Sequence, residues 1–182
     1  MKRFASYLKY AVTALLLAGP VHADDSELDA LFEGLRGADA SAAAQIEQRI
    51  YEIWSQSGSP SMDLLLTRGR DALEAGDTAL AIQHFSALID HAPGFAEGYN
   101  GRATAYFQGG RYGLSLEDIR RTLELNPRHF SAMTGLALIL QELGYPEDSL
   151  RAWREVERFH PNREGLKDAI LRLEAEVEGA AL

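Results

Sequence analysis

The chain has 182 residues, of which 46% are hydrophobic and 25% are charged, enough for one globular domain with a sizeable core. Its 27 acidic residues outnumber 18 Lys and Arg, and the net charge of −9 makes it a poor non-specific ligand for nucleic acid or anionic lipid. The absence of cysteine excludes disulfides, thiol catalysis, thiolate metal sites and covalent haem attachment.

The segment 1–23 has the three-part layout of a secretory signal peptide. Residues 1–9 carry three basic side chains and no acidic one, and a short apolar run follows. The uncharged stretch 10–22 is shorter than the roughly 20 residues that a membrane-spanning helix needs. We therefore expect cleavage near Ala23 and a periplasmic or secreted protein. The alternative is an uncleaved segment that anchors the protein in the inner membrane.

Residues 24–57 are predicted to form a helical hairpin. Apolar side chains recur at helical spacing in two segments, with Leu28, Leu31, Phe32 and Leu35 in the first and Ile46, Ile50, Ile53 and Trp54 in the second. The polar segment 55–61 is predicted to make a turn. We interpret the hairpin as a degenerate copy of the unit that follows it, although its landmarks do not align with that unit.

Between residues 62 and 163 the chain repeats itself at a constant interval. Three glycines keep this interval, Gly76, Gly110 and Gly144, and three prolines keep the same one, Pro93, Pro127 and Pro161. A glycine ends a helix by adopting the left-handed conformation, and a proline prevents a helix from continuing. The spacing therefore predicts three units, 62–95, 96–129 and 130–163, each made of two helices and two turns.

The units resemble the tetratricopeptide repeat (TPR) family, whose repeat is about 34 residues long and has an aromatic residue, Leu-Gly, Tyr, Ala, a second aromatic residue and Pro at fixed positions. The matching residues are Leu65, Arg68-Gly69, Ala72, Ala81, Phe85 and Pro93 in the first unit, Tyr99, Arg102-Ala103, Tyr106, Ser115, Ile119 and Pro127 in the second, and Met133, Leu136-Ala137, Leu140, Ser149, Trp153 and Pro161 in the third. Arg68 and Arg102 depart from the pattern because they stand where Leu is usual. The resemblance implies an all-α fold, a right-handed α-solenoid of helical hairpins with a concave face.

Residues 164–178 are predicted to form a C-terminal capping helix. Apolar side chains recur there at helical spacing, at Leu166, Ala169, Ile170, Leu173 and Val177. The opposite face of this helix is charged. The last repeat of a solenoid needs such a helix, because its apolar side would otherwise be exposed to water.

The resemblance also implies that one side of the first helix in each unit lines a peptide-binding groove. A helical wheel at about 100° per residue places this side opposite the packing residues. The candidate partner-binding residues on it are Leu66, Thr67, Arg70, Leu73, Asn100, Gly101, Thr104, Phe107, Gln108, Thr134, Gly135, Leu138 and Gln141. The apolar members are expected to form a strip, and the alternative is that the N-terminal hairpin covers some of them or that they are only semi-exposed.

Gly101 and Gly135 occupy the same position in the second and third units. Each costs its helix about 1 kcal/mol relative to Ala. Our hypothesis is that the two glycines lower the floor of the groove, so that a ligand segment approaches the backbone. The alternative is that they allow close packing of neighbouring helices.

No local motif predicts catalysis or cofactor binding. The glycines between Gly98 and Gly110 follow no predicted strand, and the Lys of a phosphate-binding loop is missing. The histidines include no His-x-x-x-His pair that would hold a metal, and we interpret them as surface or boundary residues. The pairs Glu117-Asp118 and Glu147-Asp148 are interpreted as first-turn acids that complement a helix dipole. We expect no catalytic residue, no metal and no cofactor.

These patterns predict a non-catalytic scaffold that binds a peptide segment or helix of a protein partner in the groove. Assembly of an envelope complex is the expected setting, without nucleic acid or a bound small molecule, and with membrane contact only through an uncleaved signal segment. The alternative is a structural subunit that self-associates through the solenoid ends or the convex face. A hydrolase or metal-dependent enzyme is a third, less favoured possibility.

Overall fold

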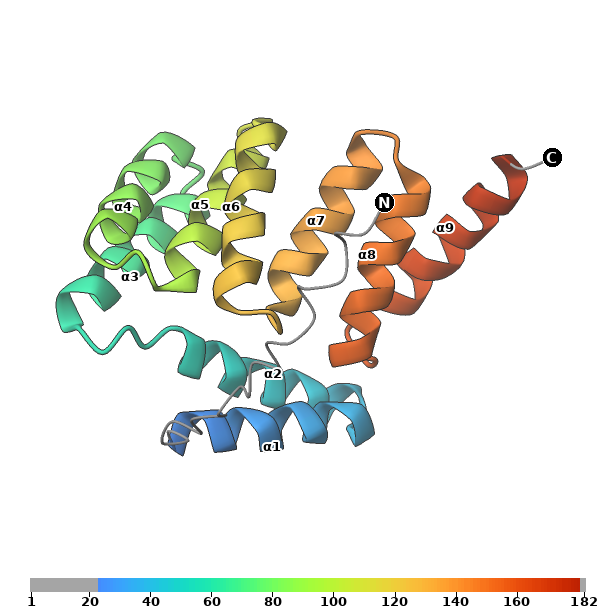
Figure 1. Ribbon diagram of the computed structural model, residues 1–182, viewed down its shortest axis with the longest axis horizontal. Helices are drawn as coiled ribbons and strands as arrows, with labels where there is room; N and C mark the ends of the chain where they lie inside the picture. Colours follow the sequence, from blue (N-terminus) through green and yellow to red (C-terminus); the bar gives the residue numbers. More distant parts are fainter. Residues whose placement is uncertain (1–22, 181–182) are drawn as a thin grey trace, which may run out of the picture.

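The computed structural model describes residues 23–180 of the chain (Figure 1). The helices in this part are α1 (Ala23–Gly37), α2 (Ala40–Trp54), α3 (Pro60–Glu74), α4 (Thr78–His91), α5 (Ala96–Gln108), α6 (Tyr112–Leu125), α7 (Phe130–Glu142), α8 (Pro146–Phe159) and α9 (Leu166–Ala180). No strand occurs between residues 23 and 180, and the pairs α3/α4, α5/α6 and α7/α8 stand side by side (Figure 1). The all-α solenoid expected from the sequence is confirmed.

The turns within the three pairs are made by the glycines that recur at a constant interval. Gly76, Gly110 and Gly144 have φ angles of 77°, 68° and 77°, in the left-handed region that favours glycine. After α3, the backbone N–H of Asp77 donates to the carbonyl oxygen of Ala72 at 2.9 Å, which closes the end of the helix. The second helix of each pair ends shortly before the recurring proline, so the signals in the sequence mark the ends of real helices.

Small side chains let the two helices of each pair approach closely. Ser115 Oγ donates to the carbonyl oxygen of Ala103 at 2.7 Å, and Ser149 Oγ donates to that of Ala137 at 2.8 Å, so equivalent bonds tie α6 to α5 and α8 to α7. In the first pair Ala81 takes this position and is fully buried. The hydrogen bond offsets the cost of removing the buried hydroxyl from water, so this position accommodates Ser as well as Ala.

The N-terminal hairpin does not extend the row of repeats. A further repeat in series would pack against α3, whereas α1 and α2 fold back and lie beneath the ends of α7 and α8 (Figure 1). The ring of Phe32 contacts those of Phe130 and Phe159, with centroids 6.3 Å and 6.1 Å away. The centroids of the Trp54 and Phe130 rings are 5.2 Å apart. The sequence-based interpretation as a degenerate copy contained no indication of this position.

Polar bonds fix the hairpin in that position around its apolar contacts. Tyr51 and Ser131 share a hydrogen bond of 2.7 Å between their hydroxyls, and Asn162 Nδ2 donates to the carbonyl oxygen of Ala38 at 2.7 Å. His160 Nε2 lies 2.9 Å from Glu47 Oε2. Because burial, apolar contacts and hydrogen bonds all lie on the same side of α1 and α2, the hairpin belongs to the largest core cluster of the described residues.

At the other end, α9 packs on α8 and covers the last repeat. Leu166, Ala169, Ile170 and Leu173 are buried, whereas Leu171 is 63% exposed on the outer side. None of the helices between residues 23 and 180 is both long and apolar enough to cross a membrane. The expected signal segment, residues 1–23, lies outside the described residues apart from Ala23, the first residue of α1.

Candidate partner-binding groove

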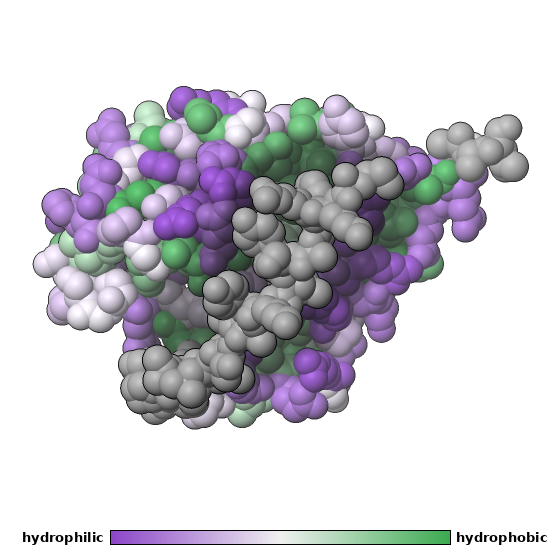
Figure 2. All heavy atoms as spheres, in the orientation of Figure 1, coloured by the Kyte–Doolittle hydropathy of each residue, from purple (hydrophilic) through white to green (hydrophobic). Residues whose placement is uncertain are grey.

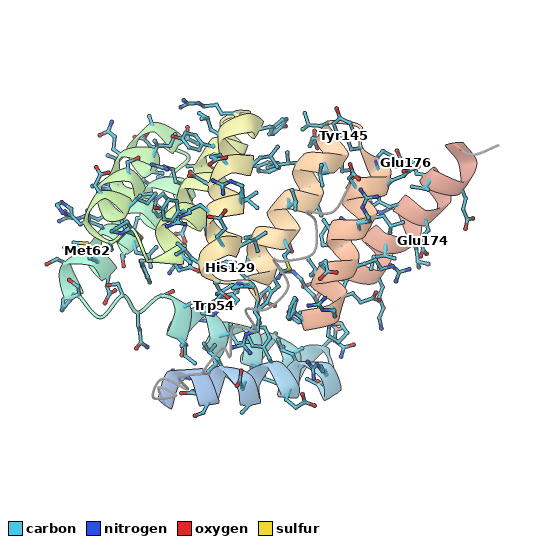
Figure 3. All side chains as sticks on the ribbon, in the orientation of Figure 1. Trp54, Met62, His129, Tyr145, Glu174 and Glu176 are labelled. Carbon is cyan, nitrogen blue, oxygen red and sulfur yellow. The ribbon has the colours of Figure 1, made fainter. Side chains whose placement is uncertain are left out.

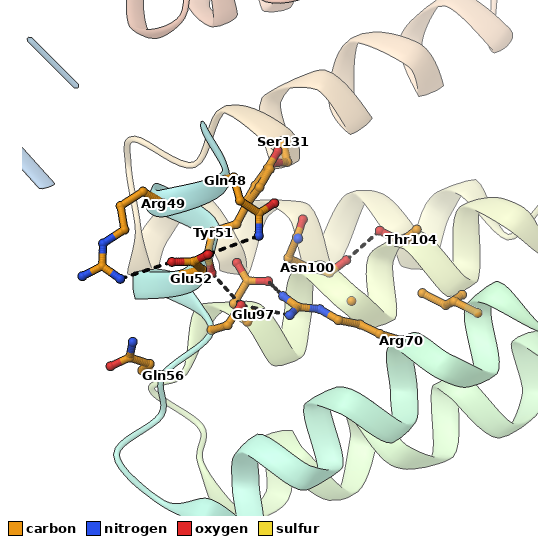
Figure 4. Close-up of a pocket in the computed structure, with 13 residues that line it drawn as sticks. Gln48, Arg49, Tyr51, Glu52, Gln56, Arg70, Glu97, Asn100, Thr104 and Ser131 are labelled. Atoms are coloured by element: carbon orange, nitrogen blue, oxygen red, sulfur yellow. Dashed lines mark hydrogen bonds and ion pairs between the residues drawn. The ribbon is translucent and has the colours of Figure 1, made fainter. Parts of the chain in front are cut away.

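The first helices of the three pairs and α2 together enclose a polar pocket of about 760 Å³ (Figure 4). The α3, α5 and α7 side is lined by Arg70, Leu73, Glu97, Asn100, Gly101, Thr104 and Ser131. The α2 side is lined by Gln48, Arg49, Tyr51 and Glu52. The linker between α2 and α3, residues 55–59, adds Ser55 and Gln56. The N-terminal hairpin therefore supplies one wall of the pocket.

An apolar hollow of about 290 Å³ continues this pocket between α5 and α7, because Asn100, Thr104 and Ser131 line both. Its remaining lining residues are Ala103, Phe107, Gln108, Ser115, Ile119, Ala132, Thr134, Gly135 and Leu138. The pocket and the hollow together are called the groove below. It combines apolar depth with a polar rim, the usual make-up of a binding site in proteins.

Hydrophobic residues also gather on the outer surface between α6 and α7, as Figure 2 shows. A hollow of about 380 Å³ lies there, lined by Leu116, Ile119, Leu123 and Leu136 with Arg120 and Glu124. Ile119 lines this hollow and also the groove. The second and third repeats are therefore packed less tightly against one another than the first and second, whose contact is filled by Phe85.

Ten of the thirteen candidate residues line the groove. Five of them line the polar pocket, namely Arg70, Leu73, Asn100, Gly101 and Thr104. Another five line the apolar hollow, namely Phe107, Gln108, Thr134, Gly135 and Leu138. Asn100 and Thr104 line both parts. Thr67 and Gln141 are exposed but line neither part. Leu66 is only 2% exposed and packs in the core of the first repeat, so its expected place in an apolar strip is wrong.

The structure explains why residue 101 is a glycine, a question that the sequence left open. A Cβ at this position would stand 2.6 Å from Cζ of Phe85, far inside contact distance, so the glycine makes room for the ring of a neighbouring helix. Gly135 differs, because the nearest atom to its Cβ position is Ile119 Cδ1 at 3.4 Å. Close helix packing therefore accounts for Gly101, while Gly135 borders open space in the hollow.

A buried ion-pair cluster joins the groove to the N-terminal hairpin. Glu97 of α5 is 3% exposed, and one of its carboxylate oxygens is hydrogen-bonded to His129 Nε2 at 2.7 Å. The other accepts a hydrogen bond from Arg70 Nη2 at 2.8 Å (Figure 4). Arg70 Nη1 also donates to Ser55 Oγ in the linker, at 2.9 Å. Trp54 stacks on the His129 ring, with centroids 4.4 Å apart (Figure 3).

A hydrogen bond from the backbone fixes the orientation of the His129 ring. Its Nδ1 accepts a hydrogen bond from the backbone N–H of Ala132 at 3.2 Å and thereby caps α7. The other ring nitrogen, Nε2, lies on the opposite side of the ring and is hydrogen-bonded to Glu97. Burial raises the pKa of Glu97, but the hydrogen bond and charge of His129, followed by the charge and hydrogen bond of Arg70, outweigh burial and lower that pKa.

His129 and His160 therefore are boundary residues, as expected, but not surface ones. They are 0% and 1% exposed, and each is bonded to a glutamate. No sequence signal distinguishes a histidine that is covered by a distant hairpin from one that stays in water. Among the described residues, no group of three or more His, Asp or Glu side chains is arranged to hold a metal ion.

The arginine that replaces Leu in the second repeat makes a buried ion pair. Arg102 donates from Nε and Nη2 to the two oxygens of Asp118 at 2.7 Å and 2.8 Å, and from Nη1 to Ser86 Oγ at 3.1 Å. Asp118 is 4% exposed and lies in the middle of α6, so its interpretation as a first-turn acid is wrong. Glu147 and Asp148 do stand in the first turn of α8.

Stacked helical hairpins with a groove along their first helices define an α-solenoid repeat protein. A sequence model of the tetratricopeptide repeat matches residues 66–118 and 102–163. The chain belongs to the tetratricopeptide repeat family, whose domains serve as scaffolds for protein–protein interaction and are mainly non-catalytic.

Individual relatives agree with this assignment. A TPR repeat-containing protein of Rhizobium etli is 33% identical over 153 residues, which cover 84% of this chain and 75% of the relative. Among solved structures, the first TPR of Spaghetti (RPAP3) bound to an HSP90 peptide has a TM-score of 0.61 at 18% identity and covers 64% of this chain and 93% of its own. The Sgt2 TPR domain from Aspergillus fumigatus has a TM-score of 0.63 at 20% identity, over 68% of this chain and 83% of its own. At these identities, the two structures show the fold alone.

Proposed function

We propose that the protein is a non-catalytic scaffold that binds a peptide segment of a partner protein in the groove. The observation that supports this most is the continuity of the polar pocket and the apolar hollow across three repeats. A partner segment would place an apolar side chain between Phe107 and Leu138, and its backbone would lie along the polar rim. Relatives of this fold include a TPR domain solved with an HSP90 peptide, which agrees with a peptide ligand.

The polar rim contains groups that are available for such a ligand. The side-chain amides of Asn100 and Gln108 have no hydrogen bond within the described residues. Arg70, by contrast, is already bonded to Glu97 and Ser55, so it is a poor candidate for clamping a carboxylate of the ligand. We therefore propose an uncharged contact with the ligand backbone, and apolar burial as the main source of affinity.

The position of α2 favours an extended segment over a helix. Gln48 and Glu52 lie across the polar pocket from α5 (Figure 4), and Gln56 also lines the pocket. A partner helix is about 10 Å across with its side chains. We propose that binding of such a helix would require α2 to move and the bonds that hold the hairpin to break, whereas an extended segment would leave α2 in place. The ligand that we propose is therefore an extended segment, and the partner helix considered from sequence is the weaker alternative.

The setting that we propose is the bacterial envelope, with the protein exported and processed near Ala23. This rests on the signal-peptide pattern of residues 1–23, and the proposed role is assembly of an envelope complex. The mass of the protein isolated from the periplasmic fraction tests the processing. A mass that includes residues 1–23 in a membrane fraction would favour the anchored alternative.

Site-specific crosslinking tests the groove. A photoreactive residue in place of Phe107 is expected to capture a partner in cells, and the same residue in place of Leu171, an exposed leucine on α9, is expected not to capture it. Gly135→Leu fills the hollow and should abolish the crosslink from position 107. Capture of the same partner from both positions, or a crosslink that Gly135→Leu leaves unchanged, would refute binding in the groove.

A further inference from the structure

The first repeat exposes a helix face that the later repeats bury. The corresponding faces of α5 and α7 pack against the helices before them: Gly98 and Ala132, which take the place of Leu64 in the second and third repeats, are both buried. Leu64 is 48% exposed. The hairpin that precedes α3 in sequence would have covered it but is docked on α7 and α8 instead.

The exposed face carries an ordered stripe of side chains. Leu64, Arg68 and Asp71 of α3 and Ala75, the residue that caps α3, are exposed. They are spaced by about one helical turn each, which places them in one line along the helix. A hollow of about 440 Å³ runs beside this line, between α3 and α4. It is lined by Arg68, Asp71, Ala72, Ala75, Leu80 and His84. The four stripe residues are called the α3 stripe below.

Arg68 is unusual among the arginines of the described residues. It alone makes no hydrogen bond, ion pair or ring contact there. Its equivalent in the second repeat, Arg102, is paired with Asp118, but the residue that corresponds to Asp118 in the first repeat is His84. The side chain of Asp71 also has no ion-pair partner between residues 23 and 180. The α3 stripe thus presents one positive and one negative charge that no described residue neutralises.

We propose that two copies of the protein associate through the α3 stripe, with the two α3 helices antiparallel about a two-fold axis. With the axis between residues 69 and 70, Leu64 lies opposite Ala75 of the second copy, and Arg68 lies opposite Asp71 of the second copy. Each large side chain then meets a small one, and each charge meets its opposite, twice over by symmetry. Helices that follow one another in the solenoid, such as α4 and α5, are likewise antiparallel. In the proposed dimer, α3 of the second copy therefore packs against α3 of the first copy as α4 packs against α5.

Charge reversal tests this pairing on the protein expressed from its full-length coding sequence. Analytical ultracentrifugation of the wild type is expected to show a concentration-dependent dimer, weak because the face is small. Arg68→Asp alone and Asp71→Arg alone should each raise the dissociation constant by about tenfold or more, since like charges then face one another. An equimolar mixture of the two variants should form a mixed dimer, because each reversed charge meets its opposite there.

Two matched variants test the apolar part of the contact. Leu64→Glu should abolish the dimer, and Leu171→Glu on α9, the same change at an exposed leucine away from α3, should leave it intact. Circular dichroism checks that both are folded. A wild-type protein that stays monomeric at the highest soluble concentration, a dimer insensitive to the charge reversals, or a mixture that fails to associate would each overturn the proposal. The photocrosslink from Phe107 is independent of this contact and should survive Arg68→Asp.

Discussion

Phe85 of α4 occupies the space that a side chain at Gly101 of α5 would need. The Cβ of an alanine there would stand 2.6 Å from Cζ of Phe85, and the ring is 0% exposed, so it has no free direction in which to move. Gly69 of α3 meets the same ring in the same way. Two glycines of neighbouring repeats therefore hold one aromatic ring, and this contact fixes the spacing of the first and second repeats.

We expect Gly101→Ala to lower the free energy of unfolding by about 1–3 kcal/mol, because the new methyl group overpacks the Phe85 ring. Gly135→Ala is the matched control at the same repeat position. Its Cβ has ordinary contact distance to Ile119, so the higher helix propensity of Ala should raise stability by up to about 1 kcal/mol. Urea unfolding of both variants measures this, and equal stability of the two would contradict the packing explanation.

Replacing Arg102 by Ala should destabilise the protein by about 2 kcal/mol or more, because it leaves the buried carboxylate of Asp118 without its partner. The double variant Arg102→Leu/Asp118→Leu should recover most of that loss, since a buried ion pair is often replaced by apolar residues at little cost. Thermal unfolding of Arg102→Leu, Asp118→Leu and the double variant completes a double-mutant cycle and gives the coupling energy. Additive losses would show that the two side chains do not act as a pair.

The pKa of Glu97 gives the stability of the protein a defined dependence on acid pH. Because this pKa is lowered in the folded protein, the ionised carboxylate stabilises the fold above the ordinary glutamate value of 4.5, and this contribution is lost as the pH falls through the folded pKa. Glu97→Gln should be less stable than the wild type at pH 7, and the difference between the two unfolding free energies should shrink as the pH falls below 4.5. The control Glu164→Gln, on the surface, should follow the wild type throughout, and a constant gap for Glu97→Gln would contradict the pKa assignment.

Trp54→Ala should release the N-terminal hairpin without unfolding the repeats. The substitution removes the stacking on His129 and the contact with Phe130, which join α2 to α7. Hydrogen exchange measured by mass spectrometry is expected to rise in α1, α2 and the linker 55–59 and to stay unchanged in α4. Trp54→Phe keeps an aromatic ring and should show much less exchange. Increased exchange in α4 as well would mean that the hairpin supports the entire fold.

The solenoid was predictable from the sequence because its signals are local. Gly76, Gly110 and Gly144 each end a helix through their own backbone conformation, which needs no distant contact. The constant interval between them indicates the number of repeats. The side of a helix that faces the groove was predictable for the same reason, since a helical wheel uses only the spacing of residues within one helix. Ten of the thirteen candidates accordingly line the groove.

What depends on distant contacts was not predictable. The wheel assigned Leu66 to the groove, but its side chain is buried in the core of the first repeat, in the same cluster as Phe85. The groove wall made by Gln48, Glu52 and Gln56 depends on where α2 docks, and that docking is decided by pairs such as Tyr51 with Ser131, 80 residues apart. The burial of His129 and His160 follows from the same docking. Nothing in the local pattern of either segment reports on the other.

The folded-back hairpin also changes how this solenoid is expected to fold and unfold. A repeat protein ordinarily unravels from its ends, because each unit touches only its neighbours. Here the bond between Asn162 and Ala38 joins residues 124 apart, and Glu47 and His160 are 113 apart. Contacts between residues so far apart in sequence slow folding, but they join the N-terminal hairpin to the last repeat. Fraying of the last repeat must therefore break contacts made by the N-terminal hairpin, and α1, α2, α7 and α8 should unfold together rather than one pair after another.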